Sequence, residues 1–277
     1  MSRITSRSLG DAQITILTTG SADFGPELFP GTAPEHINAL MAQQNAASIA
    51  TNFNAVLIRH GGRVVLADAG PRELFGPTCG FLPQALEEAG VTPAQVDTLF
   101  ATHMHPDHVA GMITPQGQAV FANAELAVSQ SEYAFWSDTA GISGLSKPVQ
   151  DWATLARAVF AAYGDRLRLV ADGAQIVPGL TTLPLPGHTP GHSGWRLDSN
   201  GATLLHVGDI VHAPVLQVAD PEIAIVFDLD PAQARAARKR LLDQIASEDA
   251  LFTGGHFLQP AFSRLTRHGQ GYQLVQA

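Results

Sequence analysis

The chain has 277 residues, 45% of them hydrophobic, so it is long enough to bury a large core. Its 16 basic and 25 acidic residues give a net charge of −9, which disfavours nucleic acid as a partner because no basic surplus can neutralise phosphates. Cys79 is the single cysteine and can form no disulfide within the chain. No signal peptide and no run of about 20 apolar residues is recognisable, so we expect a cytoplasmic protein that does not enter a membrane.

Short apolar runs of β type recur along the chain, each too short for an ordinary helix. They predict strands at residues 14–17, 55–58, 64–67, 98–101, 126–128, 180–183 and 203–206. Helices are predicted at 82–89, 149–163 and 231–246, the last with Asp230 as its N-cap. Strands in both halves predict two sheets packed face to face with helices outside, in one domain spanning residues 1–277.

Residues 20–53 separate the first two predicted strands. The segment has glycines and prolines early and then a predicted helix at 34–44. Two interpretations stay open, a lid over a site or a surface segment that caps the sheet edge, because only some loops of this length are functional.

The most specific motif follows the predicted strand at 98–101, where residues 103–108 read HMHPDH. Neutral imidazole and carboxylate suit zinc and similar divalent ions, and a metal with an open coordination position is a Lewis acid. Three further motifs follow, PGHTPGH at 186–192, HVGD at 206–209 and GGH at 254–256. Together they predict a two-metal hydrolase.

In this order the motifs resemble those of the metallo-β-lactamase superfamily, whose first motif is similar to VLADAG at 65–70. The resemblance implies an α/β fold, a four-layer αββα sandwich. Within the superfamily, LFGPT at 74–78, residues 102–109, AFW at 134–136 and GQGY at 269–272 most resemble the methyl parathion hydrolase branch and its lactonase relatives. A homodimer is also implied.

The resemblance further implies a ligand for each metal position. One metal would be bound by His103, His105 and His188, the other by Asp107, His108 and His256, with Asp209 bridging the two. Asp107 and Asp209 are also the expected catalytic carboxylates. Zinc is the expected metal, although manganese, cobalt and iron suit the same donors.

Other polar residues receive supporting roles. Asp68 follows an apolar run and is predicted to orient the metal-binding loops without binding metal itself. His192 is predicted to be structural, because Thr-Pro-Gly separates it from His188 and prevents a helical pairing. Core or surface positions are predicted for the remaining histidines, and Cys79 is predicted to be a small buried hydrophobe. These histidines are His36, His60, His206, His212 and His268.

The predicted activity is hydrolysis of lactones or aryl esters, with phosphotriesters as a further substrate class, by a metal-bridging hydroxide. The substrate is expected to be small, neutral and ester-like. Phe75 and Trp136 are predicted to wall its pocket and pack against an aryl group, although Trp136 fits a core position equally well. Phe24 and Phe29 are weaker candidates within residues 20–53.

Two alternatives remain. A glyoxalase II-like thioesterase shares the ligand types, but only 21 residues follow His256, too few for the extra helical domain of those enzymes. A non-catalytic member that binds metal or a ligand would usually have lost ligands, and none is lost here. Asp209 argues against β-lactam hydrolysis and His105 against dioxygen or nitric oxide reduction, because the superfamily branches with those activities differ at these positions.

Overall fold

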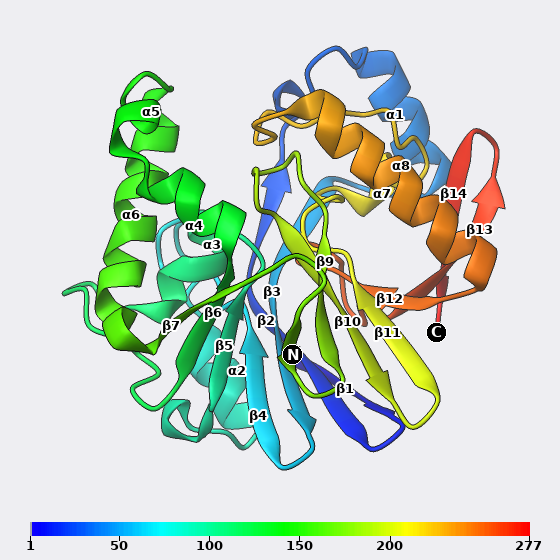
Figure 1. Ribbon diagram of the computed structural model, residues 1–277. Coiled ribbons are helices and arrows are strands. Elements are labelled where there is room, and N and C mark those ends of the chain that lie inside the picture. The colour runs from blue at the N-terminus through cyan, green and yellow to red at the C-terminus, as the bar shows by residue number, and fades with distance from the viewer. Residues whose placement is uncertain (1) are drawn as a thin grey trace.

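Two seven-stranded sheets packed face to face form the centre of the molecule (Figure 1). The computed structural model describes residues 2–277. The strands of the first sheet are β1 (Ile4–Leu9), β2 (Ala12–Phe24), β3 (Ile49–His60), β4 (Arg63–Ala67), β5 (Thr98–Ala101), β6 (Glu125–Ser129) and β7 (Leu167–Val170). Those of the second are β8 (Gln175–Val177), β9 (Leu180–Pro184), β10 (Ser193–Ser199), β11 (Ala202–His206), β12 (Leu251–Thr253), β13 (Ser263–His268) and β14 (Gly271–Gln276).

Both sheets mix antiparallel and parallel pairs. The first keeps chain order, with antiparallel pairs from β1 to β4 and parallel pairs from β4 to β7. In the second, β11 and β12 are parallel and the other pairs are antiparallel. A parallel pair needs a crossover connection, and α8 supplies it between β11 and β12.

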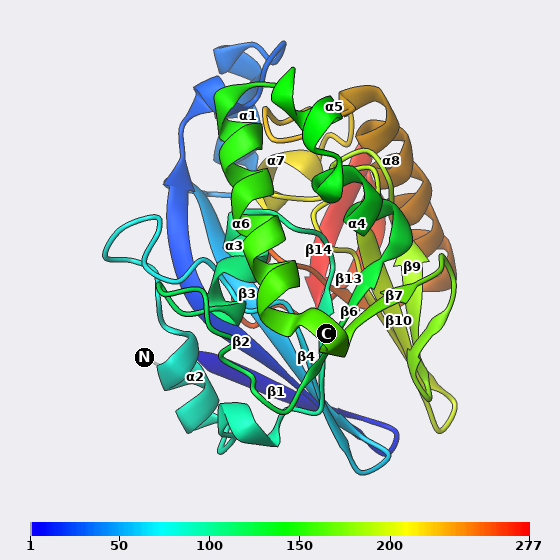
Figure 2. The same ribbon diagram turned by 60° about the vertical axis from the view of Figure 1, so that its left-hand side comes forward.

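Helices cover the outer faces of the two sheets, giving the expected αββα sandwich (Figures 1 and 2). The helices α2 and α6 pack on the first sheet, and α8 packs on the second. The helices are α1 (Pro34–Gln43), α2 (Leu82–Glu88), α3 (Pro106–Val109), α4 (Gln130–Ser137), α5 (Thr139–Ser143), α6 (Lys147–Tyr163), α7 (Pro214–Gln217) and α8 (Pro231–Glu248).

The first sheet is buried on both faces, which explains its continuous apolar runs. In β3, Val56 and Ile58 belong to the core between the sheets, whereas Ala55 and Leu57 belong to the core under the helices. Successive side chains of a strand point to opposite faces, so a strand covered on both sides needs apolar residues at every position. The run at 55–58 therefore fits a central strand.

All seven predicted strands and the predicted helices are confirmed. The Asp230 side chain caps α8 by accepting a hydrogen bond from Gln233 N at 3.0 Å. Cys79 is buried, as expected for a small hydrophobe. The apolar-run pattern missed β1, β7, β8, β10, β12, β13 and β14, because these strands are shorter, more polar or interrupted.

The segment at 20–53 extends the β2–β3 pair and then returns through α1. Its helix packs through Ile37 and Leu40 in a separate small core with Leu216 of α7 and Ile225. The segment thus connects two neighbouring strands of the first sheet and is itself well packed. The lid interpretation stays a prediction. Within residues 2–277, no helix has the length and apolar character that crossing a membrane requires.

Candidate metal centre

The predicted ligands come from four segments that follow strands. His103 and His105 follow β5, and the first turn of α3 carries Asp107 and His108. The other three follow strands of the second sheet: His188 after β9, Asp209 after β11 and His256 after β12. The paired sheets deliver all seven side chains to one place, and six of them are buried while Asp107 is partly exposed.

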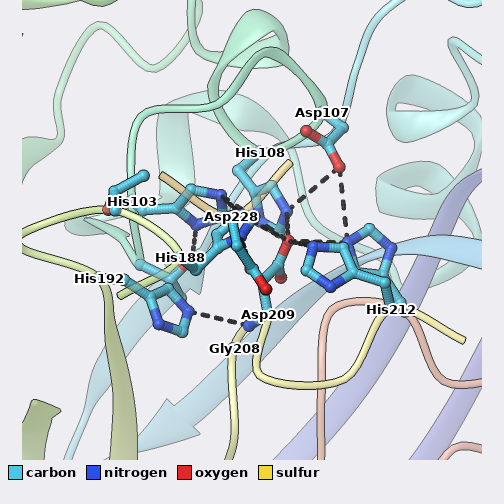
Figure 3. A network of polar contacts seen from close by, with 12 residues as sticks. His103, Asp107, His108, His188, His192, Gly208, Asp209, His212 and Asp228 are labelled. Atoms are coloured by element: carbon cyan, nitrogen blue, oxygen red, sulfur yellow. Dashed lines mark hydrogen bonds and ion pairs between the residues drawn. The ribbon is translucent and has the colours of Figure 1, made fainter. Parts of the chain in front are cut away.

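One carboxylate oxygen, Asp209 Oδ2, lies at the centre of the cluster (Figure 3). It is 2.8 Å from His256 Nε2 and 3.0 Å from His108 Nε2. On the other side it is 3.6 Å from His188 Nε2 and 3.7 Å from His103 Nε2. Asp209 therefore lies between the two predicted ligand groups, as a bridging residue should.

The ligand atoms divide into the two predicted groups. His103, His105 and His188 form one, and Asp107, His108 and His256 join Asp209 in the other, with the ligand atoms of each group within 4.8 Å of one another. The first set consists of imidazole nitrogens alone, and the second combines imidazole nitrogens with carboxylate oxygens. Zinc, manganese, cobalt and iron accept both kinds of donor.

Carboxylates hold two of the imidazoles from behind. His108 Nδ1 donates to Asp68 Oδ2 at 2.9 Å, and His188 Nδ1 donates to Asp228 Oδ1 at 2.9 Å. Each bond places the proton on Nδ1 and turns Nε2 toward Asp209. Metal-binding histidines in proteins are commonly oriented in this way.

Two more imidazoles have the same orientation with other acceptors. His256 Nδ1 donates to the carbonyl oxygen of Asn52 at 2.9 Å. The Thr102 hydroxyl donates to Asp68 Oδ2 at 2.8 Å, so it accepts at 3.1 Å from His103 Nδ1. In these four predicted ligands Nδ1 is therefore the nitrogen that carries the proton, and Nε2 is the nitrogen left to bind a metal. In His108 and His256, Nε2 is hydrogen-bonded to Asp209 Oδ2 and would exchange that bond for the metal.

The cluster fits a bound cation better than any internal pairing. His103 Nε2 and His188 Nε2 are 3.1 Å apart, so two lone pairs face each other when both rings carry their proton on Nδ1. His105 Nε2 and Asp209 Oδ1 are buried without a hydrogen-bond partner among the described residues. Buried polar atoms are normally satisfied, and a divalent ion would satisfy all of these.

Burial and charge adjust the protonation of the ligands in opposite directions. Burial lowers the pKa of His105 to about 3 and holds the pKa of His103 and His188 well below the usual range, so these rings are neutral. Burial also acts on His108 and His256, but the carboxylates around them, Asp209 first, raise their pKa. A cation at this group would take the place of a proton.

The predicted supporting residues lie beside the ligands. Asp68 accepts from Thr102 N at 2.9 Å as well as from His108, and it belongs to neither of the two predicted ligand groups. His192 Nδ1 donates to Leu185 O at 2.7 Å, and its Nε2 accepts from Asp209 N at 2.9 Å. His192 therefore holds the backbone of Asp209.

A sequence model of the metallo-beta-lactamase superfamily matches residues 51–256, which contain all seven predicted ligands. The chain belongs to this superfamily. The predicted family and the αββα fold are thus confirmed. No curated protein sequence matches the chain.

Several solved structures of the superfamily fold share the whole architecture. The hydrolase AbOPH is 29% identical with a TM-score of 0.94, covering 100% of this chain and 98% of its own. AidC, described as a dizinc quorum-quenching lactonase, is 22% identical with a TM-score of 0.89 and the same coverage. A probable metal-dependent hydrolase from Staphylococcus aureus is 21% identical with a TM-score of 0.79, covering 98% of this chain and 99% of its own.

Two residues of this superfamily site were not predicted from the sequence. His212, assigned to the core or surface, lines the pocket, with Nε2 3.3 Å from Asp209 Oδ2 and its ring stacked on His256 at 4.9 Å. In the sequence, the only indication that His212 lies near the site is its position three residues after Asp209. Nothing in the sequence indicates that Asp228 accepts a hydrogen bond from His188, because it lies 40 residues farther along the chain. His206 is a core residue, as predicted, stacked on Trp195.

The aromatic wall of the pocket differs partly from the prediction. Phe75 lines the pocket, but Trp136 is fully buried beneath His105 and donates from its indole nitrogen to Glu132. Placing Trp136 in the pocket was therefore wrong. The tryptophan on the wall is Trp152, whose ring lies 4.6 Å from that of His105. Both tryptophans pack on the same imidazole from different helices, α4 and α6, which local sequence does not distinguish.

The remaining wall is also aromatic. Phe24, at the end of β2, lines the pocket together with Phe53 and Phe227. Phe29 is buried behind Phe24, with ring centroids 6.3 Å apart, and does not line it. The cavity has a volume of about 280 Å³.

Proposed function

We propose that this protein is a two-metal hydrolase of small, uncharged, ester-like substrates, with lactones and aryl esters as the principal class. The observation that carries the proposal is the position of Asp209. Its Oδ2 atom lies within 3.7 Å of imidazole nitrogens from both ligand groups, next to an apolar pocket. A carboxylate so placed can serve two cations at once.

We assign the ligand residues to two metal positions. His103, His105 and His188 would hold one divalent ion, and Asp107, His108 and His256 the other, with Asp209 shared. Two ions held there would supply Lewis acidity and a water of lowered pKa. Zinc is the proposed metal, because imidazole with a few carboxylates is a common zinc environment.

The pocket walls select the substrate. Phe24, Phe53, Phe75, Trp152 and Phe227 present apolar faces, and the described lining contains no lysine or arginine. A charged substrate would lose its hydration in this pocket without gaining a partner, whereas an aryl or acyl group gains apolar contact. His212 lines the same pocket beside Asp209, so a substrate bound there would lie against its ring.

Phosphotriesters are proposed as a second substrate class, because they too are uncharged and a pair of metals can clamp displacement at phosphorus as well as at carbon. The likeness in fold to the lactonase AidC supports testing lactones first.

The test is a rate panel on protein of measured metal content, with lactones, aryl esters, phosphotriesters and glutathione thioesters at equal concentration. We expect about two ions per chain and the highest kcat/KM with a lactone or aryl ester. Fastest cleavage of the glutathione thioester would favour the thioesterase alternative. Two bound ions with no turnover of any substrate would favour a binding protein. The metal-free protein is the control.

A further inference from the structure

A buried glutamate outside the ligand set receives four hydrogen bonds. Glu132, in α4, is fully buried. Its Oε1 accepts from Met104 N at 2.8 Å and from Trp136 Nε1 at 2.6 Å. Its Oε2 accepts from the Thr189 hydroxyl at 2.6 Å and from Gly191 N at 3.1 Å. One carboxylate therefore ties α4 to two segments that are far apart in the sequence.

Those two segments carry the three ligands of one metal position. Met104 lies between His103 and His105, and Thr189 directly follows His188. Each of the three ligands is therefore adjacent in sequence to a residue that bonds to Glu132. The bonds to the other ligand group come from elsewhere, because His108 and His256 are held by Asp68 and Asn52.

We propose that Glu132 is a positioning residue that sets the spacing between the His103–His105 segment and His188, and that it acts on this metal position alone. The inference rests on the two-metal site proposed above. The carboxylate fixes one segment with each oxygen, so the two segments cannot move apart without breaking a bond to a buried charged group.

The role requires a carboxylate and cannot be filled by an amide. Three of the four partners are N–H groups, which only donate, and the Thr189 hydroxyl donates as well. A glutamine would turn its NH₂ group toward at least one of these N–H donors and lose the bond without any change in volume. The glycine at 191 is also required, because a Cβ there would lie 2.1 Å from Glu132 N.

The test measures zinc affinity at each metal position, without reference to turnover. Metal-free protein is titrated with zinc against a chromophoric chelator, in one background that retains the His103–His105–His188 position (His256→Ala) and one that retains the other (His105→Ala). We expect Glu132→Gln to weaken zinc binding about 10- to 100-fold in the first background, the usual effect of losing a residue that orients metal ligands. In the second background we expect no change. Glu87→Gln, an exposed glutamate on α2, is the matched control and should change neither.

Two milder variants decide the question if Glu132→Gln does not fold. Thr189→Val removes a bond that joins a ligand segment to Glu132, whereas Trp136→Phe removes the bond within α4 and keeps an aromatic ring against His105. Weaker zinc binding in Thr189→Val, with unchanged zinc binding in Trp136→Phe, supports the proposal.

Three results would overturn it. They are equal weakening of both positions by Glu132→Gln, unchanged zinc affinity in that variant, and equal effects of Thr189→Val and Trp136→Phe. If the wild-type chain binds fewer than two ions, the two-metal site itself is refuted, and the role of Glu132 with it.

Discussion

Two tryptophans lie beside His105, and replacing them one at a time should have different effects: one replacement should lower the stability of the fold and the other should change substrate selectivity. Trp136 is fully buried and Trp152 lines the pocket. Trp136→Ala leaves a cavity, which for a buried aromatic costs about 3–5 kcal/mol, and also removes the indole hydrogen bond to Glu132. That loss is a large share of the roughly 5–15 kcal/mol that stabilises an ordinary domain. At about 2–4 °C per kcal/mol, we expect the Tm to fall by roughly 6–20 °C.

Trp152→Ala should instead alter substrate choice. Removing part of the apolar wall costs roughly 1–3 kcal/mol of transition-state binding for an aryl lactone, or about 5- to 150-fold in kcat/KM. A short aliphatic lactone does not reach the missing ring and should lose less. The informative quantity is the ratio of kcat/KM between the two lactones, because any change in metal content or ligand geometry affects both substrates and cancels.

The assays are thermal unfolding of the metal-loaded proteins and the kcat/KM ratio at matched metal content, with Trp136→Phe as the control that keeps the buried ring. A ratio changed by Trp136→Ala and unchanged by Trp152→Ala would refute this assignment of the pocket wall. A Tm unaffected by Trp136→Ala would contradict its place in the core.

Three further predictions concern the ligand cluster. Asp209→Asn should preserve the circular dichroism spectrum and lower kcat roughly 10²- to 10³-fold, because the shared carboxylate becomes a neutral amide; wild-type turnover with two ions bound would contradict its bridging role. Zinc affinity should rise with pH, because His108 and His256, whose pKa values are raised mainly by Asp209, must lose a proton to bind metal. Zinc affinity is measured by competition titration from pH 5 to 8, and an affinity that does not change with pH would count against both residues as ligands. His212→Gln should lower kcat while two ions remain bound, since His212 lies beside Asp209 on the pocket wall, and an unchanged kcat would place it outside the chemistry.

The fold and the cluster of candidate ligands could be predicted from the sequence for a physical reason. Imidazoles and carboxylates packed as densely as at 103–108 have few uses other than metal binding, and three of the four motifs lie at or just after a predicted strand, at 98–101, 180–183 and 203–206. Strands covered on both faces read as continuous apolar runs, as at 55–58, so the central strands were recognisable too. The supporting role predicted for Asp68 rests on its place at the end of such a run.

The tertiary structure alone decided the groups that surround those ligands. Asp228 meets His188, and Glu132 meets Met104 and Thr189, across long separations in the chain, so no local spacing marks them. Trp136 and Trp152 occur in similar helical contexts, and only the packing of α4 and α6 places one inside and the other on the pocket wall. Metal ligands are identified by their own chemistry, whereas a pocket wall or an orienting carboxylate is defined by its neighbours, which exist only after the sheets have packed.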